Sequence, residues 1–148
     1  MTIQKMQPER LKEALDLIWR VFSEFEAPEY SEKGIATFRE FIELDAMKNR
    51  MAKGEIDLWY SEEDGVITGV IAMRKPSHIS LLFVDKQHHN KGIAKGLVAA
   101  ATSGHTTVTV HSSPYAVEIY KKLGFVPTDC EQLEDGIRYT PMVWEKQK

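Results

Sequence analysis

In the segment 84–97 an apolar strand pattern ends at Val84, a polar turn follows, and an apolar helix pattern is expected to begin near Gly92. The first backbone N–H groups of a helix have no partner within the helix and lie at the positive end of its dipole, so they can bind a phosphate or pyrophosphate. Gly92 would let the backbone approach such a ligand, and Ala94 is the next smallest residue. Lys91 and Lys95 add positive charge. The turn therefore predicts a phosphate site, although a plain turn with solvated lysines fits the glycine pattern equally well.

A second group of residues that could take part in chemistry lies at 111–125. Ser113 is a favoured N-cap residue, and Gly124 is placed to end the following helix in the left-handed conformation. Tyr120 falls on the apolar face of that helix, and a phenol with a pKa of about 10 is protonated at neutral pH and can donate. His111 has an ordinary pKa of about 6.5, which suits proton transfer. A well-capped amphipathic helix with a buried tyrosine explains the same pattern.

Periodicity and turn signals predict the elements that would hold these residues. Alternating apolar residues, with a hairpin signal at Asp64-Gly65, predict strands over 2–5, 56–62, 66–74, 79–84, 106–110, 125–128 and 138–145. Helical spacing predicts helices from Pro8 to Pro28 and over 31–53, 92–102 and 114–123. The order β-α-α-β-β-β-α-β-α-β-β predicts a mixed α/β sheet, with parallel pairing where a helix joins two strands. Because no linker or repeat divides the sequence, we expect one domain over residues 1–148.

Both groups of residues resemble signatures of the GNAT superfamily, the acyl-CoA-dependent N-acyltransferases. His89-Asn90-Lys91-Gly92-Ile93-Ala94 is similar to its (Arg/Gln)-x-x-Gly-x-(Gly/Ala) loop, with histidine at the first position. The run from Ala116 to Phe125 is similar to its second signature, Ala-x-x-x-Tyr-x-x-Leu-Gly-Phe. Two signatures in the right order, with a helix and a strand between them, are more specific than either alone. The resemblance covers residues 79–125 closely and implies a GNAT-like fold for most of the chain.

The resemblance implies direct transfer of an acetyl group from acetyl-CoA to a primary amine of a small molecule or peptide. In this family the strand before the phosphate loop splays from its parallel neighbour, which here means strand 79–84 from strand 106–110. A backbone N–H near Leu82 would polarise the thioester carbonyl, and Tyr120 matches a general acid for the leaving sulfur. The implied acetyl-CoA contacts are Leu82, Phe83, Val84, His89, Asn90, Lys91, Gly92, Ile93, Ala94, Lys95 and, at the pantetheine arm, Ser113.

The general base and the acceptor are less well defined. His111, just past the strand 106–110, is the first candidate for the base, and His78, Glu24 and Glu26 are others; the amine could also lose its proton through water. The family builds its acceptor pocket from the first two helices, which suggests Glu24, Glu26 and Tyr30 as substrate contacts. Their acidic surroundings favour a cationic acceptor such as a polyamine, an aminoglycoside-like amine or a lysine side chain. A solvated acidic turn is an equally good explanation.

Composition and charge narrow the functional class. A net charge of −3 gives no reason to expect binding to nucleic acid or to an anionic membrane. Cys130 is the only cysteine and the histidines lack metal-binding spacing, so we expect no metal site. Without a recognisable secretion signal or an apolar stretch of roughly 18 residues, we expect a cytoplasmic protein. A homodimer is compatible with the sequence, because the strands at the edges of the predicted sheet could pair with a second chain.

Two other functions fit part of the pattern. A non-catalytic module could bind acyl-CoA as a sensor or interaction domain, but it would have no need of Tyr120. An enzyme of another class could bind a different phosphorylated ligand, such as a nucleotide, but the phosphate-binding patterns GxxxxGK[ST] and GxGxxG are absent.

Overall fold

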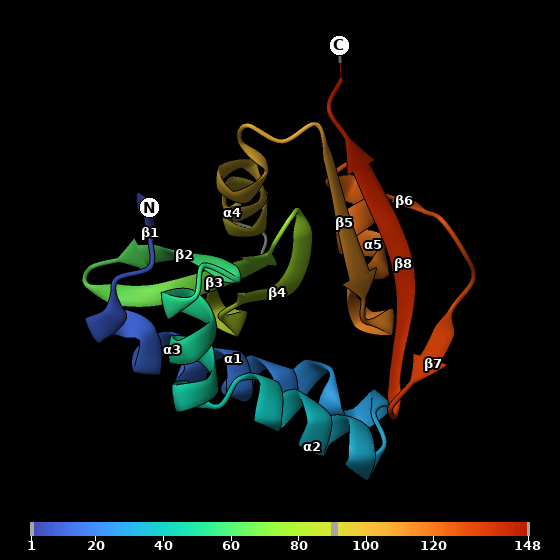
Figure 1. Cartoon of the computed structure of the whole chain (residues 1–148), viewed down its shortest axis with the longest axis horizontal. Helices are drawn as coiled ribbons and strands as arrows, with labels where there is room; N and C mark the ends of the chain where they lie inside the picture. The colour runs from blue at the N-terminus through green and yellow to red at the C-terminus, as the bar shows by residue number, and fades with distance from the viewer. Residues whose placement is uncertain (1, 90–91, 148) are drawn as a thin grey trace.

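A central sheet organises the computed structural model, which describes residues 2–89 and 92–147 (Figure 1). Its strands are β1 (Thr2–Lys5), β2 (Ile56–Glu63), β3 (Val66–Arg74), β4 (His78–Val84), β5 (Thr107–Ser112), β6 (Val126–Pro127), β7 (Gln132–Glu134) and β8 (Ile137–Glu145). The order across the sheet is β1-β2-β3-β4-β5-β8-β6, with β7 paired to β8. Strands β4 and β5 pair in parallel and the other pairs are antiparallel, so the predicted mixed sheet is confirmed.

The helices cover both faces of the sheet (Figure 1). They are α1 (Leu11–Phe25), α2 (Glu32–Phe41), α3 (Leu44–Ala52), α4 (Ile93–Thr102) and α5 (Val117–Lys122). Short 3-10 turns lie at Pro8–Arg10, Ala27–Glu29, Lys86–His88 and Pro114–Ala116. The first three helices lie on one face, and α4 and α5 lie on the other.

The side chains of β3 show how the sheet divides the core into two layers. Val70 and Ala72 pack in the cluster beneath α1, whereas Ile71 and Met73 pack in the cluster beneath α4. Because successive side chains of a strand point to opposite faces, an almost continuous apolar strand supplies both layers. Aromatic side chains of the strands add to the core: Tyr60 is buried, and Trp59 and Trp144 pack against the second cluster.

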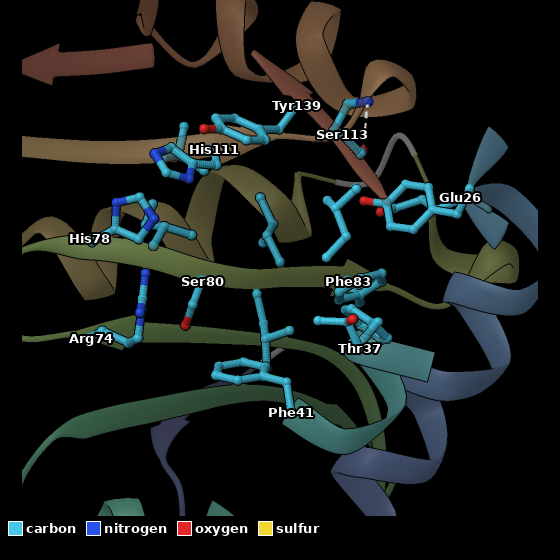
Figure 2. A pocket seen from close by; sticks show the side chains of 18 of the residues that line it. Glu26, Thr37, Phe41, Arg74, His78, Ser80, Phe83, His111, Ser113 and Tyr139 are labelled. Carbon is cyan, nitrogen blue, oxygen red and sulfur yellow. Dashed lines mark hydrogen bonds between the residues drawn. The ribbon is translucent and has the colours of Figure 1, made fainter. Parts of the chain in front are cut away.

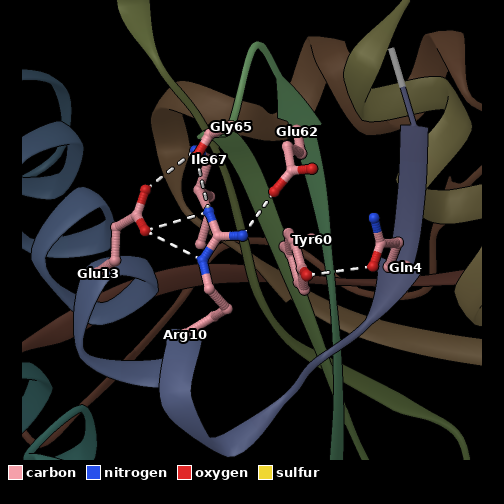
Figure 3. A network of polar contacts seen from close by, with 7 residues as sticks. All are labelled: Gln4, Arg10, Glu13, Tyr60, Glu62, Gly65 and Ile67. Carbon is pink, nitrogen blue, oxygen red and sulfur yellow. Dashed lines mark hydrogen bonds and ion pairs between the residues drawn. The ribbon is translucent and has the colours of Figure 1, made fainter.

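A polar network joins the start of α1 to the β2–β3 hairpin (Figure 3). The guanidinium of Arg10 donates to the carboxylates of Glu13 and Glu62 and, at 3.1 Å, to the carbonyl oxygen of Gly65. The turn residues Asp64 and Gly65 have φ angles of 53° and 80°. Positive φ at both central positions characterises the tight hairpin turn that the sequence predicted.

The helix predicted over residues 31–53 is two helices, α2 and α3, and in this detail the prediction was wrong. Ser31 caps α2 by accepting from the N–H of Gly34 at 3.1 Å. The backbone of Glu43 is extended, and its carboxylate accepts from the N–H of Asp45 at 2.8 Å to cap α3. A glutamate rarely serves as an N-cap, so this break was hard to predict from the sequence. The short strand β7 was also not predicted.

Strands β4 and β5 separate after a short contact. Their register pairs His78 with Thr109 and Ile79 with Val110, and the described residues show no pairing beyond these. Figure 1 shows the two strands diverging from there. On its other side, β4 carries an extra residue at Ser80, where the register with β3 shifts. The predicted opening between these two strands is therefore confirmed.

Candidate functional site

The backbone of β4 directs hydrogen-bonding groups into the opening. The N–H of Asp85 donates to the carbonyl oxygen of Thr68 in β3 at 2.8 Å. Because alternate residues of a strand turn their N–H and C=O groups to opposite sides, those of Leu82 and Val84 face away from β3. The carbonyl oxygen of Val84 fits this direction, since the side chain of His89 binds it at 2.8 Å. The N–H of Leu82 is left facing the opening toward β5.

A first cavity, of about 430 Å³, lies between β4, the start of α4 and α5. The predicted cosubstrate contacts that line it are Leu82, Phe83, Val84, His89, Gly92, Ile93, Ala94 and Lys95. Asn90 and Lys91, which were also predicted, lie outside the described residues. The end of β4 and the start of α4, which flank the predicted phosphate turn, therefore line one cavity.

The start of α4 presents backbone donors to this cavity. Gly92 is the N-cap residue with a φ of 78°, and it has no side chain that could cap the helix. The first bond of the helix runs from the N–H of Gly96 to the carbonyl oxygen of Gly92 at 3.0 Å. The N–H groups of Ile93, Ala94 and Lys95 precede that bond, so they have no partner within the helix. Together with the helix dipole they make this end suitable for an anionic ligand.

His89 ties the turn to the strand that precedes it. A carbonyl oxygen only accepts hydrogen bonds, so the 2.8 Å contact with Val84 means that Nε2 of His89 carries the hydrogen and donates. The imidazole also lies 5.4 Å from the ring of Phe25, between centroids. His89 occupies the position at which the GNAT signature loop has arginine or glutamine. Its side chain holds the loop against β4 through the bond to Val84.

A second cavity, of about 380 Å³, lies on the other side of β4 (Figure 2). Helix α2, the β7–β8 turn and strand β5 contribute to its walls. The predicted site residues that line it are Glu26, Tyr30, His111, Ser113 and Tyr120, and His78 lines it as well. The two cavities share Glu26, Leu82, Phe83 and Ala116, so they meet at the middle of the opening.

Glu26 is a buried carboxyl group at this junction. It follows the last residue of α1 and is 9 % exposed. Burial raises the pKa of Glu26 to about 7, although the hydroxyl of Ser113 acts in the opposite direction. Desolvation disfavours the ionised form of a carboxyl group, which explains the direction of the pKa shift. Near neutral pH this group can therefore both release and accept a proton.

Tyr120 lies in the wall of the second cavity and is 4 % exposed. Burial, and then the charge of Glu26, raise the pKa of Tyr120 above its ordinary value. The helix that holds it ends as predicted, because Gly124 has a φ of 98° and the N–H of Phe125 bonds the carbonyl oxygen of Tyr120 at 3.0 Å. With its pKa raised, the phenol is protonated at neutral pH and can donate its proton.

His78 and His111 lie together at the end of the second cavity away from Glu26 (Figure 2). Their ring centroids are 4.7 Å apart, and His111 stacks on Tyr139 at 4.2 Å. Burial, followed by the charges of His111 and Arg74, lowers the pKa of His78 to about 4. Burial and the charge of Arg74 also lower the pKa of His111. His111 lines the second cavity only and does not reach the junction of the two cavities.

The remaining predicted site residues, Tyr30, Glu24 and Ser113, lie in different surroundings. Tyr30 lines the second cavity and lies edge-on to Phe22. Glu24 forms an ion pair with Lys86 at 2.9 Å and lines neither cavity in the described part of the chain. Ser113 accepts from the N–H of Ala116 at 3.3 Å and faces the second cavity, not the first.

Arg74 and Tyr139 line the second cavity but were not predicted as site residues. Arg74 ends β3 and pairs in register with His78, which begins β4. The short connection over residues 75–77 was the signal that could have placed these two residues side by side. Tyr139 comes from β8, and only the long-range pairing of β8 with β5 brings it to His111.

The described residues show neither a metal site nor a membrane span. No group of at least three side chains of metal-binding type comes together among them. Within residues 2–89 and 92–147, no helix has the length and apolar character needed to cross a bilayer.

Comparison with known protein families identifies a matching family model. A family model described as "Acetyltransferase (GNAT) domain" matches residues 26–146. A search of curated protein sequences gave no significant match.

Several solved structures share the fold. A GCN5-related N-acetyltransferase from Rhodopseudomonas palustris has a TM-score of 0.81 and 19% identity, over 98% of this chain and 95% of that one. The PaiA N-acetyltransferase from Thermoplasma acidophilum, in complex with coenzyme A, has a TM-score of 0.80 and 19% identity, over 99% and 100% of the two chains. Histone acetyltransferase HPA2 and related acetyltransferase from Corynebacterium glutamicum has a TM-score of 0.74 and 16% identity, over 99% and 97%. At these identities the likeness concerns the fold.

Proposed function

The chain belongs to the GNAT acetyltransferase family, and on that premise we propose that it transfers an acetyl group from acetyl-CoA to a primary amine of a small molecule or peptide. The observation that carries the proposal is the meeting of two cavities at the opened side of β4, beside the buried carboxyl of Glu26. One cavity suits the thioester and the other suits the amine. Because they meet, the acetyl group can pass directly between the two substrates.

Acetyl-CoA fits the first cavity because of what the chain presents there. The N–H groups of Ile93, Ala94 and Lys95 can bind its diphosphate, and Lys122 adds positive charge to the same wall. The coenzyme A in the T. acidophilum structure supports this assignment. When bound, the thioester supplies an activated acetyl group. Leu82 and Phe83 line both cavities and would flank the acetyl end.

The N–H of Leu82 is the group that would polarise the acetyl carbonyl. It faces the opening on the side of β4 away from β3, as the bond from Asp85 to Thr68 implies. Negative charge grows on the carbonyl oxygen as the amine attacks, and a fixed donor stabilises that charge. Removing a donor of this kind typically costs roughly 3 kcal/mol of transition-state stabilisation.

Glu26 and Tyr120 would move the protons. Glu26 accepts a proton from the ammonium group, and the neutral nitrogen then forms a bond to the acetyl carbon. The bond from that carbon to sulfur breaks, and Tyr120 donates its proton to the sulfur. The nitrogen loses a second proton, which replaces the one that Tyr120 gave. An ammonium ion and acetyl-CoA thus yield an amide, CoA thiol and one proton.

Among the candidates for the base, Glu26 has the strongest support. It lines both cavities, whereas His111 lines the second cavity only and lies against Tyr139. The elevated pKa of Glu26, about 7, also suits a base at neutral pH. We therefore assign the base to Glu26 and leave Glu24, which is paired with Lys86, outside the site.

Release of free thiol from acetyl-CoA in the presence of a panel of primary amines tests the function. We expect release that depends on both the protein and the amine, together with an equal amount of acetylated amine. If no amine in a chemically broad panel accelerates release, the chain is a CoA-binding module and not an acetyltransferase.

A further inference from the structure

Arg74 differs from the other arginines of the chain. Of the six arginines, three form ion pairs with carboxylates: Arg10, Arg20 and Arg138. Two others, Arg39 and Arg50, lie over aromatic rings. Arg74 lines the second cavity and is solvent-accessible, yet no ion pair joins it to a described carboxylate. A guanidinium that faces a cavity without an ion-pair partner of its own is suited to bind an anionic oxygen group.

We propose that the acceptor carries an anionic oxygen group, a carboxylate or a phosphate, which binds Arg74 while the amine of the same molecule lies at Glu26. The inference rests on the proposed acetyl transfer, because that reaction places an amine in the second cavity. It makes the acceptor zwitterionic, with its two charges at opposite ends of the cavity.

The register of three strands builds the anionic end. Arg74 pairs with His78 across β3 and β4, and His78 pairs with Thr109 across β4 and β5. His111 follows two residues after Thr109 in the same strand, so it also reaches this end. Figure 2 shows Arg74, His78 and His111 together, with Glu26 at the other end of the cavity. The imidazoles bring hydrogen-bonding groups beside the guanidinium.

Two acidic side chains also line this cavity, and each contacts a side chain other than Arg74. Glu134 lines the cavity, and its carboxylate accepts from the hydroxyl of Tyr139 at 3.1 Å. Asp135 also lines the cavity and forms an ion pair with Lys33 at 3.6 Å. Both histidines have lowered pKa values and are neutral at neutral pH. Arg74 therefore supplies the fixed positive charge at this end.

The length of β4 sets the distance between the two charges of the acceptor. His78 and Leu82 are four residues apart, which corresponds to roughly 13 Å along an extended strand. The side chain of Arg74 reaches into the cavity and shortens the gap, but several bonds must still separate the amine from the anion. A long ω-amino acid meets this requirement, and a short α-amino acid does not.

Matched amines test the inference. 6-Aminohexanoate and 6-aminohexyl phosphate carry the anion, hexylamine lacks it, and 1,6-diaminohexane replaces it with a cation. We expect at least one of the anionic amines to exceed hexylamine in kcat/KM by about tenfold or more, as a charge-assisted contact would give. Arg74→Gln should bring that ratio close to one. Lys75→Gln is the matched control, because Lys75 is the next residue, faces Asp57 and lines neither cavity.

Equal or faster reaction of hexylamine or of the diamine with the wild type would overturn the inference, and so would a preference that survives in Arg74→Gln. If no amine releases thiol, the proposed function fails, and binding then decides the inference. For that case, calorimetry with CoA present measures binding of 6-acetamidohexanoate, the product analogue. Binding to the wild type that weakens in Arg74→Gln supports the anionic site, and equal or absent binding rejects it.

Discussion

Glu26 combines burial with access to both cavities, so its ionisation should control the rate. Only the ionised carboxylate accepts a proton. We therefore expect kcat/KM for the amine to rise with pH and to level off above an apparent pKa of about 7. Glu26→Gln should remove this inflection and lower kcat by roughly 100-fold or more. Initial rates of thiol release between about pH 5 and about pH 9 measure both effects.

The stability of the Glu26→Gln variant separates a catalytic effect from unfolding. The pKa of Glu26 is higher in the folded chain than its ordinary value of 4.5, so the folded state binds more protons between these values. Stability from this group is thus highest at low pH and falls as the pH rises toward about 7. The amide carries no charge to bury, so at alkaline pH the variant should melt no lower than the wild type. An unchanged pH profile in a folded variant would remove Glu26 from the reaction.

Tyr120 should affect the chemical step and not the binding of acetyl-CoA. Its ring lines the acceptor cavity and not the one that we assign to acetyl-CoA. We expect Tyr120→Phe to lower kcat by about 100-fold while the KM for acetyl-CoA changes little. Tyr60→Phe is a control, because that buried hydroxyl bonds Gln4 at the far edge of the sheet. A normal kcat in Tyr120→Phe would exclude the general acid role.

Helix α4 depends on a glycine whose conformation other residues seldom adopt. Gly92 has a φ of 78°, and a Cβ added there would meet no atom of residues 2–89 and 92–147 within 4 Å. An alanine would therefore be strained by roughly 1–2 kcal/mol and would project into space that the diphosphate needs. We expect Gly92→Ala to weaken acetyl-CoA binding by about tenfold or more in calorimetry.

The β2–β3 hairpin offers a matched control for this helix start. Gly65 has a φ of 80° and equally open surroundings, but it lies in the hairpin, away from both cavities. Gly65→Ala should lower the free energy of unfolding by about as much as Gly92→Ala does and leave the affinity for acetyl-CoA unchanged. Equal affinity in both variants would show that the start of α4 does not hold the diphosphate.

The elements that the sequence predicted correctly are those with local signals. The start of α4 at Gly92 and the end of α5 at Gly124 follow from single glycines, and the hairpin follows from Asp64-Gly65. The acceptor cavity was harder to predict because its walls come from distant strands and α2, which only long-range pairing brings together. Local sequence also could not show that Glu24 turns to Lys86 while its neighbour Glu26 turns inward.

Binding of acetyl-CoA should stabilise the folded chain as a whole. A ligand at 100 times its Kd adds about 2.7 kcal/mol, which for a chain of this length raises the Tm by roughly 5–10 °C. We expect such a shift with acetyl-CoA and CoA, and smaller shifts with ATP and NAD. Thermal unfolding with each ligand measures this directly. A larger shift with ATP or NAD would indicate a different phosphorylated ligand in the first cavity.

The meeting of the cavities at β4 requires that both substrates are bound at once. Steady-state rates with acetyl-CoA and an active amine varied together test this most directly. Direct transfer predicts sequential kinetics, in which double-reciprocal lines intersect. Parallel lines would indicate that CoA leaves before the amine binds, through an acetylated form of the protein, and would contradict the account.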